Sequence, residues 1–220
     1  MHIDFILDTV CAWSYIAKRR LDEAILAFPR LKFDICVHPF LIAPPAALWR
    51  DRPEIHIDMA ARTRELRQKI EPAAREVGLV INFDALPSIP DSVPSHILVR
   101  YGFEQNKGME TLEAVFSAYF IRGENIGDPD VLSCLAKQCG LDTETLRKKL
   151  DTDFPPTSLP LLWRKSGVRG IPCFIFDQKT LISGAQSIDV FKRMIELYLT
   201  LRQENTKNRE DFTNFIENPF

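Results

Sequence analysis

The sequence lacks the features that would direct it to a membrane or to nucleic acid. No apolar run among its 220 residues is long enough to span a bilayer. Residues 1–4 have no basic segment of the kind that opens a signal peptide. The formal net charge of -2 provides no general attraction for nucleic acid. We therefore expect a soluble, cytoplasmic protein with no membrane partner and no nucleic-acid partner.

Cysteine pairs with C-x-x-C spacing are also missing. An odd number of widely scattered cysteines argues against a disulfide framework, because such frameworks use paired thiols in exported chains. No histidine lies close in sequence to the two cysteines nearest one another, so we expect no metal site there. The five cysteines are Cys11, Cys36, Cys134, Cys139 and Cys173.

The most informative stretch that is present covers residues 2–28. Residues 2–8 alternate between apolar and polar side chains, which predicts a buried strand. Cys11 follows a short turn and begins a helix that ends before Pro29. A thiol at a helix N-terminus faces the positive end of the helix dipole, which favours the thiolate. We therefore predict a reactive Cys11 with a pKa below that of a free thiol.

The remaining elements indicate an α/β protein with a helical insertion. A second strand over residues 31–40 completes a βαβ unit with parallel pairing. A helical block follows, and after it come two short strands and a last helix, which is the element order of a thioredoxin fold. The predicted helices cover residues 55–76, 95–105, 109–122, 129–139, 143–150 and 187–202, and the later strands cover 171–176 and 180–183.

This order divides the chain into three parts. We expect a discontinuous thioredoxin-like domain over residues 1–45 and 158–203, an all-helical insertion over 46–157 and a polar tail over 204–220. Residues 158–166 are predicted to be the end of a helix. Residues 18–20, Lys-Arg-Arg, are expected on a solvated helix face.

Six stretches resemble, in order, motifs of the FrnE-like proteins of the DsbA family. The resemblance implies a DsbA-like fold, thiol–disulfide oxidoreductase activity and a cis peptide bond before Pro172. It also implies that the backbone of Ile171 lies beside the reactive cysteine and can pair with an extended peptide or with glutathione. The stretches are residues 8–16 (DTVCAWSYI), 38–40 (HPF), 95–98 (SHIL), 118–128 (AYFIRGENIGD), 167–174 (GVRGIPCF) and 183–186 (SGAQ).

The chain departs from this family at the position of the second active-site cysteine. The family pattern is C-P-W-C, whereas this chain has Cys11, Ala12, Trp13 and Ser14. Ser14 cannot release a mixed disulfide, so Cys11 needs an outside thiol such as glutathione or one of the other four cysteines. Its hydroxyl is instead placed to donate a hydrogen bond to the Cys11 thiolate. Trp13 is expected to cover the thiol and contact substrate.

Other candidate residues follow from the same resemblance. His96 matches the insertion motif and is a candidate for contact with substrate and for tuning Cys11, and His38 is a weaker candidate for tuning. Glutathione is the candidate cofactor, held by Ile171 and by a turn whose N–H groups are placed for a carboxylate. That turn consists of Gly184, Ala185 and Gln186.

Three functions remain open. The first is a DsbA-like oxidoreductase with one nucleophilic thiol, acting on a thiol or disulfide in a protein or a small molecule. The second is a glutathione-dependent isomerase or transferase, because the chain is similar to 2-hydroxychromene-2-carboxylate isomerases and kappa-class glutathione transferases. The third is a non-catalytic thiol- or peptide-binding module. Cys173 is expected to be an inert core residue, with a resolving role as the alternative, and a homodimer is compatible with the sequence.

Overall fold

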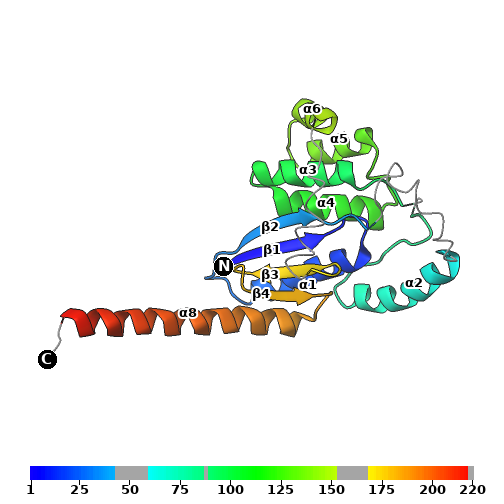
Figure 1. The fold of residues 1–220 in the computed structure, drawn as a ribbon. Coiled ribbons are helices and arrows are strands. Elements are labelled where there is room, and N and C mark those ends of the chain that lie inside the picture. The colour runs from blue at the N-terminus through cyan, green and yellow to red at the C-terminus, as the bar shows by residue number, and fades with distance from the viewer. Residues whose placement is uncertain (43–58, 87–88, 153–167, 218–220) are drawn as a thin grey trace.

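The protein is described by a computed structural model over residues 1–42, 59–86, 89–152 and 168–217 (Figure 1). A four-stranded sheet has the order β2-β1-β3-β4. β1 pairs in parallel with β2, while β3 is antiparallel to both β1 and β4. This mixed sheet confirms the predicted thioredoxin fold. The strands are β1 (His2–Leu7), β2 (Asp34–Pro39), β3 (Cys173–Phe176) and β4 (Thr180–Ser183).

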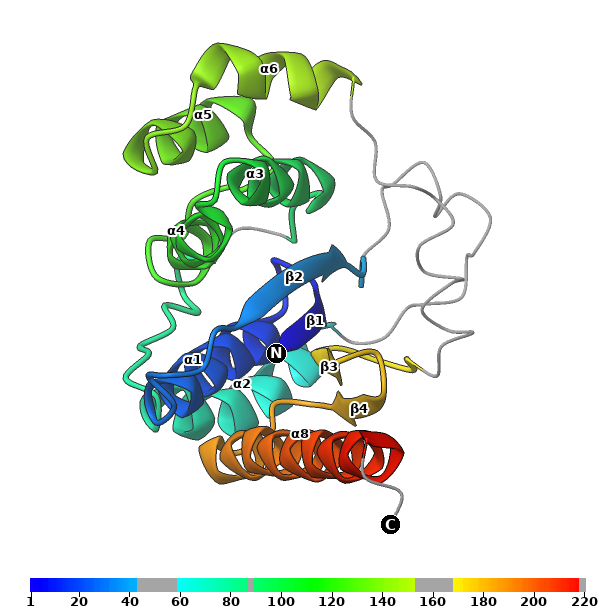
Figure 2. The ribbon, with the colours of Figure 1, turned by 90° about the vertical axis from the view of Figure 1, so that its left-hand side faces the viewer.

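Each described helix overlaps a helix that the sequence predicts, although not every boundary agrees. The α3–α6 block stacks beside the β2 edge of the sheet, and α8 runs beside the β4 edge (Figures 1 and 2). None of the described helices is both long and apolar enough to cross a membrane. The helices are α1 (Ala12–Leu26), α2 (Met59–Arg75), α3 (Val93–Glu104), α4 (Gly108–Phe120), α5 (Pro129–Gln138), α6 (Thr143–Thr152) and α8 (Ile188–Glu217).

One face of the sheet forms the core. The alternating residues Ile3, Phe5 and Leu7 are fully buried on this face. Phe5 stacks on Phe174 of β3 with ring centroids 4.3 Å apart, and Phe174 meets Phe191 of α8 edge to face at 4.9 Å. Because side chains alternate along a strand, the residues between Ile3, Phe5 and Leu7 point to the opposite face of the sheet. The two faces therefore carry different sets of side chains.

Helix α1 joins the sheet to the helical block. Tyr15 stacks on Phe116 of α4 at 4.8 Å, and its hydroxyl donates to Glu113 Oε1 at 2.7 Å. Lys18 Nζ donates to Glu113 Oε2 at 2.6 Å, and only 5% of the Lys18 residue is exposed. The expectation of a solvated Lys-Arg-Arg face is therefore wrong at Lys18, because α4 covers that part of α1.

Several predicted boundaries also need correction. α8 continues to Glu217, whereas the sequence prediction ended it near residue 202 and assigned a separate tail to 204–220. The stretch contains strong helix formers and no glycine or proline before Pro219, so nothing local ends the helix earlier. Figure 1 shows the end of α8 extending beyond the other elements. Pro72 lies inside α2 without dividing it.

Other predictions lie outside the described residues. The helix end expected over residues 158–166 falls there, and so do the domain boundaries near residues 45 and 158. The division of the chain into two domains therefore stays a prediction.

Candidate thiol site

The candidate site begins where β1 ends and turns into α1. The Cys11 N–H donates to the Asp8 carbonyl oxygen at 3.0 Å, which closes this turn. Cys11 is the N-cap residue of α1 with an extended backbone (φ -97°, ψ 108°), and the first helical turn carries no acid. The prediction that the helix begins at Cys11 is confirmed.

The sheet register brings the Pro172 segment to the same edge. Ile6 of β1 pairs with Cys173 of β3, the residue that directly follows Pro172. The Ile171–Pro172 peptide bond is cis, as the family resemblance implies. Ile171 is partly buried and packs with the cluster formed by Ile6, Val168 and Cys173. The turn that carries Cys11 and the segment expected to hold substrate therefore adjoin one another.

Two buried polar side chains, Asp8 and His96, meet at the turn between β1 and α1. Asp8 is fully buried and accepts from the backbone N–H of Ile42 at 2.7 Å. His96 of α3 is 6% exposed, and its Nε2 lies 3.3 Å from Asp8 Oδ1. His96 thus contacts the turn through Asp8.

A second polar pair links the same two segments. Thr9 and Ser95 are fully buried, and their hydroxyl oxygens lie 2.7 Å apart. The Ser95 hydroxyl donates to the Ser92 carbonyl oxygen at 2.8 Å, so the Thr9 hydroxyl is the donor to Ser95. The start of α3 is therefore attached to the turn at two adjacent positions, 8 and 9.

The pKa of Cys11 differs from the prediction. Burial raises the pKa of the Cys11 thiol above its ordinary value, and the Asp8 carboxylate raises it further. The Ser14 hydroxyl and the backbone N–H groups of Ser14 and Trp13 act in the opposite direction but do not outweigh the burial. The expected pKa below that of a free thiol is therefore wrong, because a helix N-terminus stabilises a thiolate less than desolvation destabilises it here.

Ser14 has an unusual environment. The residue is fully buried, and its hydroxyl oxygen makes no hydrogen bond with any other described residue. Unpaired buried polar groups are rare and often have a chemical role. The hydroxyl is close enough to Cys11 to lower the thiol pKa, so a thiolate at Cys11 is the acceptor that this site offers. Trp13 is partly exposed and packs against the core, so its predicted contact with the thiol stays a prediction.

The turn expected to bind glutathione is tied to the Pro172 segment. The Gly184 N–H donates to the Pro172 carbonyl oxygen at 2.7 Å, and the Gln186 N–H donates to the Gly184 carbonyl oxygen at 2.9 Å. Arg20 of α1 donates to the Ala185 carbonyl oxygen at 2.7 Å. Two of the backbone N–H groups considered for a carboxylate are thus already used within the protein.

None of the other cysteines forms a disulfide with Cys11. All five cysteines are free thiols. Cys173 is fully buried, and burial raises its pKa to about 11, which agrees with the inert core role expected for it. His38 Nε2 lies 2.7 Å from Asp4 Oδ1, on the face of the sheet opposite the apolar core.

Sequence reasoning missed the buried acid and its neighbours. Asp8, Thr9 and Ser95 were present in the quoted motifs but were given no role. A usable signal existed, because positions 8–9 and 95–96 are adjacent polar pairs in two otherwise apolar segments. Tyr119, whose pKa is raised to about 12 by burial and by Asp8, carried no such signal.

Comparison with known proteins gives one family and several similar chains. The sequence profile described as DSBA-like thioredoxin domain matches residues 2–196. The uncharacterized protein YwbO of Bacillus subtilis is 28% identical over 199 residues, covering 89% of this chain and 96% of YwbO.

Two solved structures share the fold. A 2-hydroxychromene-2-carboxylate isomerase superposes with a TM-score of 0.68 at 16% identity, covering 96% of this chain and 98% of that one. The cytosolic disulfide reductase DsbM of Pseudomonas aeruginosa, solved with GSH, superposes with a TM-score of 0.65 at 19% identity, covering 91% of this chain and 100% of that one.

Proposed function

The chain belongs to the DSBA-like thioredoxin domain family, and from this membership we propose a glutathione-dependent thiol–disulfide oxidoreductase that acts through the single thiol of Cys11. The observation that carries the proposal is the position of Cys11 at the N-cap of α1, close to the fully buried Ser14, whose hydroxyl lowers the pKa of the Cys11 thiol against the effect of burial. A serine at this position supports the thiolate but cannot form a disulfide. The enzyme therefore takes its second thiol from solution.

The proposed reaction has two exchange steps. In the first, the Cys11 thiolate attacks a glutathione mixed disulfide, R–S–S–G, forming a Cys11–glutathione disulfide and releasing R–S⁻, which takes up a proton from water. In the second, a glutathione thiolate attacks that disulfide, releasing oxidised glutathione and regenerating Cys11. One molecule of R–S–S–G and one of glutathione give R–SH and oxidised glutathione, so electrons balance without another reductant.

The raised pKa of Cys11 favours the reducing direction. Strongly oxidising relatives gain their potential from a stabilised thiolate in the reduced form. Burial and Asp8 destabilise that thiolate here, so the reduced form is a better electron donor. A reducing activity needs a reducing compartment, which agrees with the cytoplasmic location expected from the sequence.

Neighbouring groups have supporting roles in this proposal. Asp8 and His96 hold the turn in place, and the Asp8 charge influences the pKa of Cys11. An extended substrate would lie along the backbone of Ile171 and Pro172, with Trp13 beside the reacting sulfur. Support for glutathione comes from the DsbM structure, which has the same fold and contains GSH.

The test is a coupled assay with the mixed disulfide of glutathione and 2-mercaptoethanol, in which glutathione reductase consumes NADPH. Cys11→Ser should abolish turnover, and Ser14→Ala should slow it, because the thiolate loses a hydrogen-bond donor. Cys134→Ser, at an exposed cysteine, is the matched control and should leave the rate unchanged. Full activity of Cys11→Ser would refute the proposal.

Ser14→Cys gives a sharper test of the resolving step. The introduced thiol would attack the Cys11–glutathione disulfide and release glutathione within the protein. Release from the pre-formed adduct should then no longer need added glutathione. Continued dependence on added glutathione would mean that position 14 does not face the Cys11 sulfur.

A second function is favoured by one specific observation. A neutral Cys11 thiol and the unpaired Ser14 hydroxyl are two neutral donors, which is a setting for polarising the sulfur of bound glutathione. A glutathione-dependent isomerase would use them in this way. Calorimetry with S-methylglutathione, which cannot exchange disulfides, tests the isomerase function. An isomerase needs a saturable binding site for this compound, and Cys11→Ala should retain that site.

A non-catalytic module is the third function. It predicts that Cys11→Ala leaves partner binding intact and that the coupled assay shows no turnover.

A further inference from the structure

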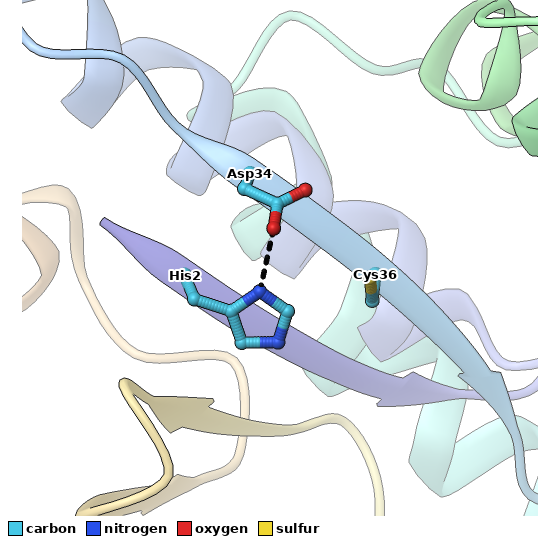
Figure 3. A group of neighbouring side chains, drawn as sticks. All are labelled: His2, Asp34 and Cys36. Atoms are coloured by element: carbon cyan, nitrogen blue, oxygen red, sulfur yellow. Dashed lines mark hydrogen bonds and ion pairs between the residues drawn. The ribbon is translucent and has the colours of Figure 1, made fainter.

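A second group of reactive side chains lies at the start of β1 and β2, whereas Cys11 follows the end of β1. His2 of β1 pairs in register with Asp34 of β2, and Cys36 lies two residues further along β2 on the same face. Figure 3 shows these three side chains together, with the Asp34 carboxylate directed at the His2 ring. One donor atom from each lies within 4.8 Å of the other two. In the described part of the chain, these residues bring nitrogen, oxygen and sulfur donors to one point.

The His2 ring is held in an orientation suited to coordination. Its Nδ1 lies 2.9 Å from Asp34 Oδ2, inside the group, and its Nε2 lies 3.1 Å from Asp4 Oδ1, behind it. Asp4 is itself fixed, because its Oδ1 also lies 2.7 Å from His38 Nε2. A carboxylate behind a histidine ring is the usual support of a metal-bound imidazole, since it fixes the ring and increases its basicity.

We propose that His2 Nδ1, Asp34 and the Cys36 thiolate bind a zinc ion. Imidazole, carboxylate and thiolate are the three ligand types that proteins use for Zn²⁺, while Mg²⁺ and Ca²⁺ prefer oxygen alone. Zn²⁺ ligands at about 2.0–2.3 Å from the metal lie roughly 3.5 Å from one another in a tetrahedral site. Side-chain rotations are therefore enough if they shorten a separation of up to 4.8 Å by about 1.3 Å and widen the 2.9 Å His2–Asp34 contact slightly, and water completes the fourth position.

The burial of the group fits a site that a metal can enter. The Asp34 side chain is 77% exposed and that of His2 is 28% exposed, so solvent reaches the donor atoms. The supporting Asp4 side chain is only 15% exposed. Binding displaces the thiol proton of Cys36 and, from a His2 ring protonated on both nitrogens, the Nδ1 proton, while the Nε2 proton stays in the hydrogen bond to Asp4; both displaced protons pass to solvent without any change of oxidation state. The ion would link the first residues of β1 to those of β2.

The spacing of the cysteines along the chain predicts no metal site. Here the ligands come from two strands, and the parallel register of β1 and β2 brings residue 2 beside residues 34 and 36. A sequence motif cannot show this arrangement, because His2 is more than thirty positions from the other two ligands along the chain.

Cobalt(II) is the probe for the test, because a Co²⁺–thiolate bond gives a charge-transfer absorption band that a protein without thiolate ligation lacks. Untagged, reduced full-length protein is titrated with Co²⁺, and Zn²⁺ is then added as competitor. We expect a thiolate band that saturates at one Co²⁺ per chain and disappears with Zn²⁺. No thiolate band at stoichiometric Co²⁺ would overturn the proposal and leave the group as an ion-pair network only.

Variants identify the ligands. Cys36→Ser should remove the band, and Asp34→Asn, at a side chain that is 77% exposed, should weaken Zn²⁺ binding at least about tenfold. Cys11→Ser, at a partly exposed cysteine, and Cys134→Ser, at an exposed one, are matched controls, and they should keep the band. A band that survives Cys36→Ser, or one lost in Cys11→Ser, would contradict the assignment.

Asp4→Asn tests the support behind His2. Because Asp4 touches the ring and not the metal, this variant should keep the thiolate band while lowering Zn²⁺ affinity by about 10- to 100-fold. Unchanged affinity would show that Asp4 does not position His2 for the metal. Circular dichroism of each apo variant establishes that the fold is intact before the titration.

Discussion

Replacing Glu113 with glutamine should weaken the junction between α1 and the helical block. Glu113 accepts from Lys18 Nζ at 2.6 Å and from the Tyr15 hydroxyl at 2.7 Å. The Lys18 side chain is only 6% exposed, so its charge depends on protein partners. Glu113→Gln removes one of two carboxylates and leaves Asp22, whose Oδ2 lies 2.8 Å from Lys18 Nζ.

The size of the effect follows from that geometry. Removing one partner of a fully buried ion pair costs about 3–5 kcal/mol. Here Lys18 keeps Asp22 and Glu113 is 30% exposed, so we expect a loss of about 1–2 kcal/mol in the free energy of unfolding. For a chain of this size that corresponds to a drop of about 2–8 °C in Tm. Urea unfolding and thermal melts followed by circular dichroism measure both quantities.

The same pair predicts how the difference depends on pH. Burial alone would raise the pKa of Glu113, but the Lys18 charge and the hydrogen bonds from Lys18 and Tyr15 lower it below its ordinary value of 4.5. Because the folded carboxyl binds a proton less tightly than the unfolded one, its stabilisation is fully present above pH 4.5 and is lost as the pH falls through the folded pKa. The gap between wild type and Glu113→Gln should therefore close in acid.

Glu110→Gln is the control, at an exposed acid on the same helix, and it should change the free energy of unfolding by less than about 0.5 kcal/mol. Equal stability of wild type and Glu113→Gln near neutral pH would refute the reasoning. So would a gap that stays constant below pH 4.5.

Two further predictions concern the thiol and the core. Asp8→Asn removes a charge that adds to the effect of burial on Cys11, so the pKa of the thiol should fall and alkylation by iodoacetamide near neutral pH should become faster; an unchanged or slower rate would contradict this electrostatic role. Phe174→Ala removes the fully buried ring between Phe5 and Phe191 and should cost about 3–5 kcal/mol in urea unfolding, whereas Leu181→Ala, at a position 38% exposed, should cost far less.

The parts of the fold that sequence predicted well depend on local pattern. The alternation at Ile3, Phe5 and Leu7 and the order of elements were enough to indicate the mixed sheet and the helix that begins at Cys11. The polar residues after position 203 predict a separate tail, whereas α8 continues through them to Glu217. Helix-forming polar residues continue a helix until a proline or glycine intervenes.

The sequence predicted the position of the thiol site but not the direction in which the pKa of Cys11 is shifted. The helix dipole at Cys11 is a local property that sequence reveals, whereas desolvation of the sulfur and the charge of Asp8 arise from tertiary packing. Lys18 is a similar case, because its burial depends on α4, almost a hundred residues further along the chain. The group around His2 depends on the register of two strands. In each case the deciding contact joins segments distant in sequence.

The central claim is that Cys11 forms a disulfide with glutathione and is released by a second glutathione. Peptide mapping by mass spectrometry after incubation with the glutathione mixed disulfide tests it most directly, with exposed Cys134 as the internal reference. The account predicts an adduct at Cys11 that disappears when glutathione is added. An adduct absent from Cys11, or one that added glutathione does not remove, would contradict it.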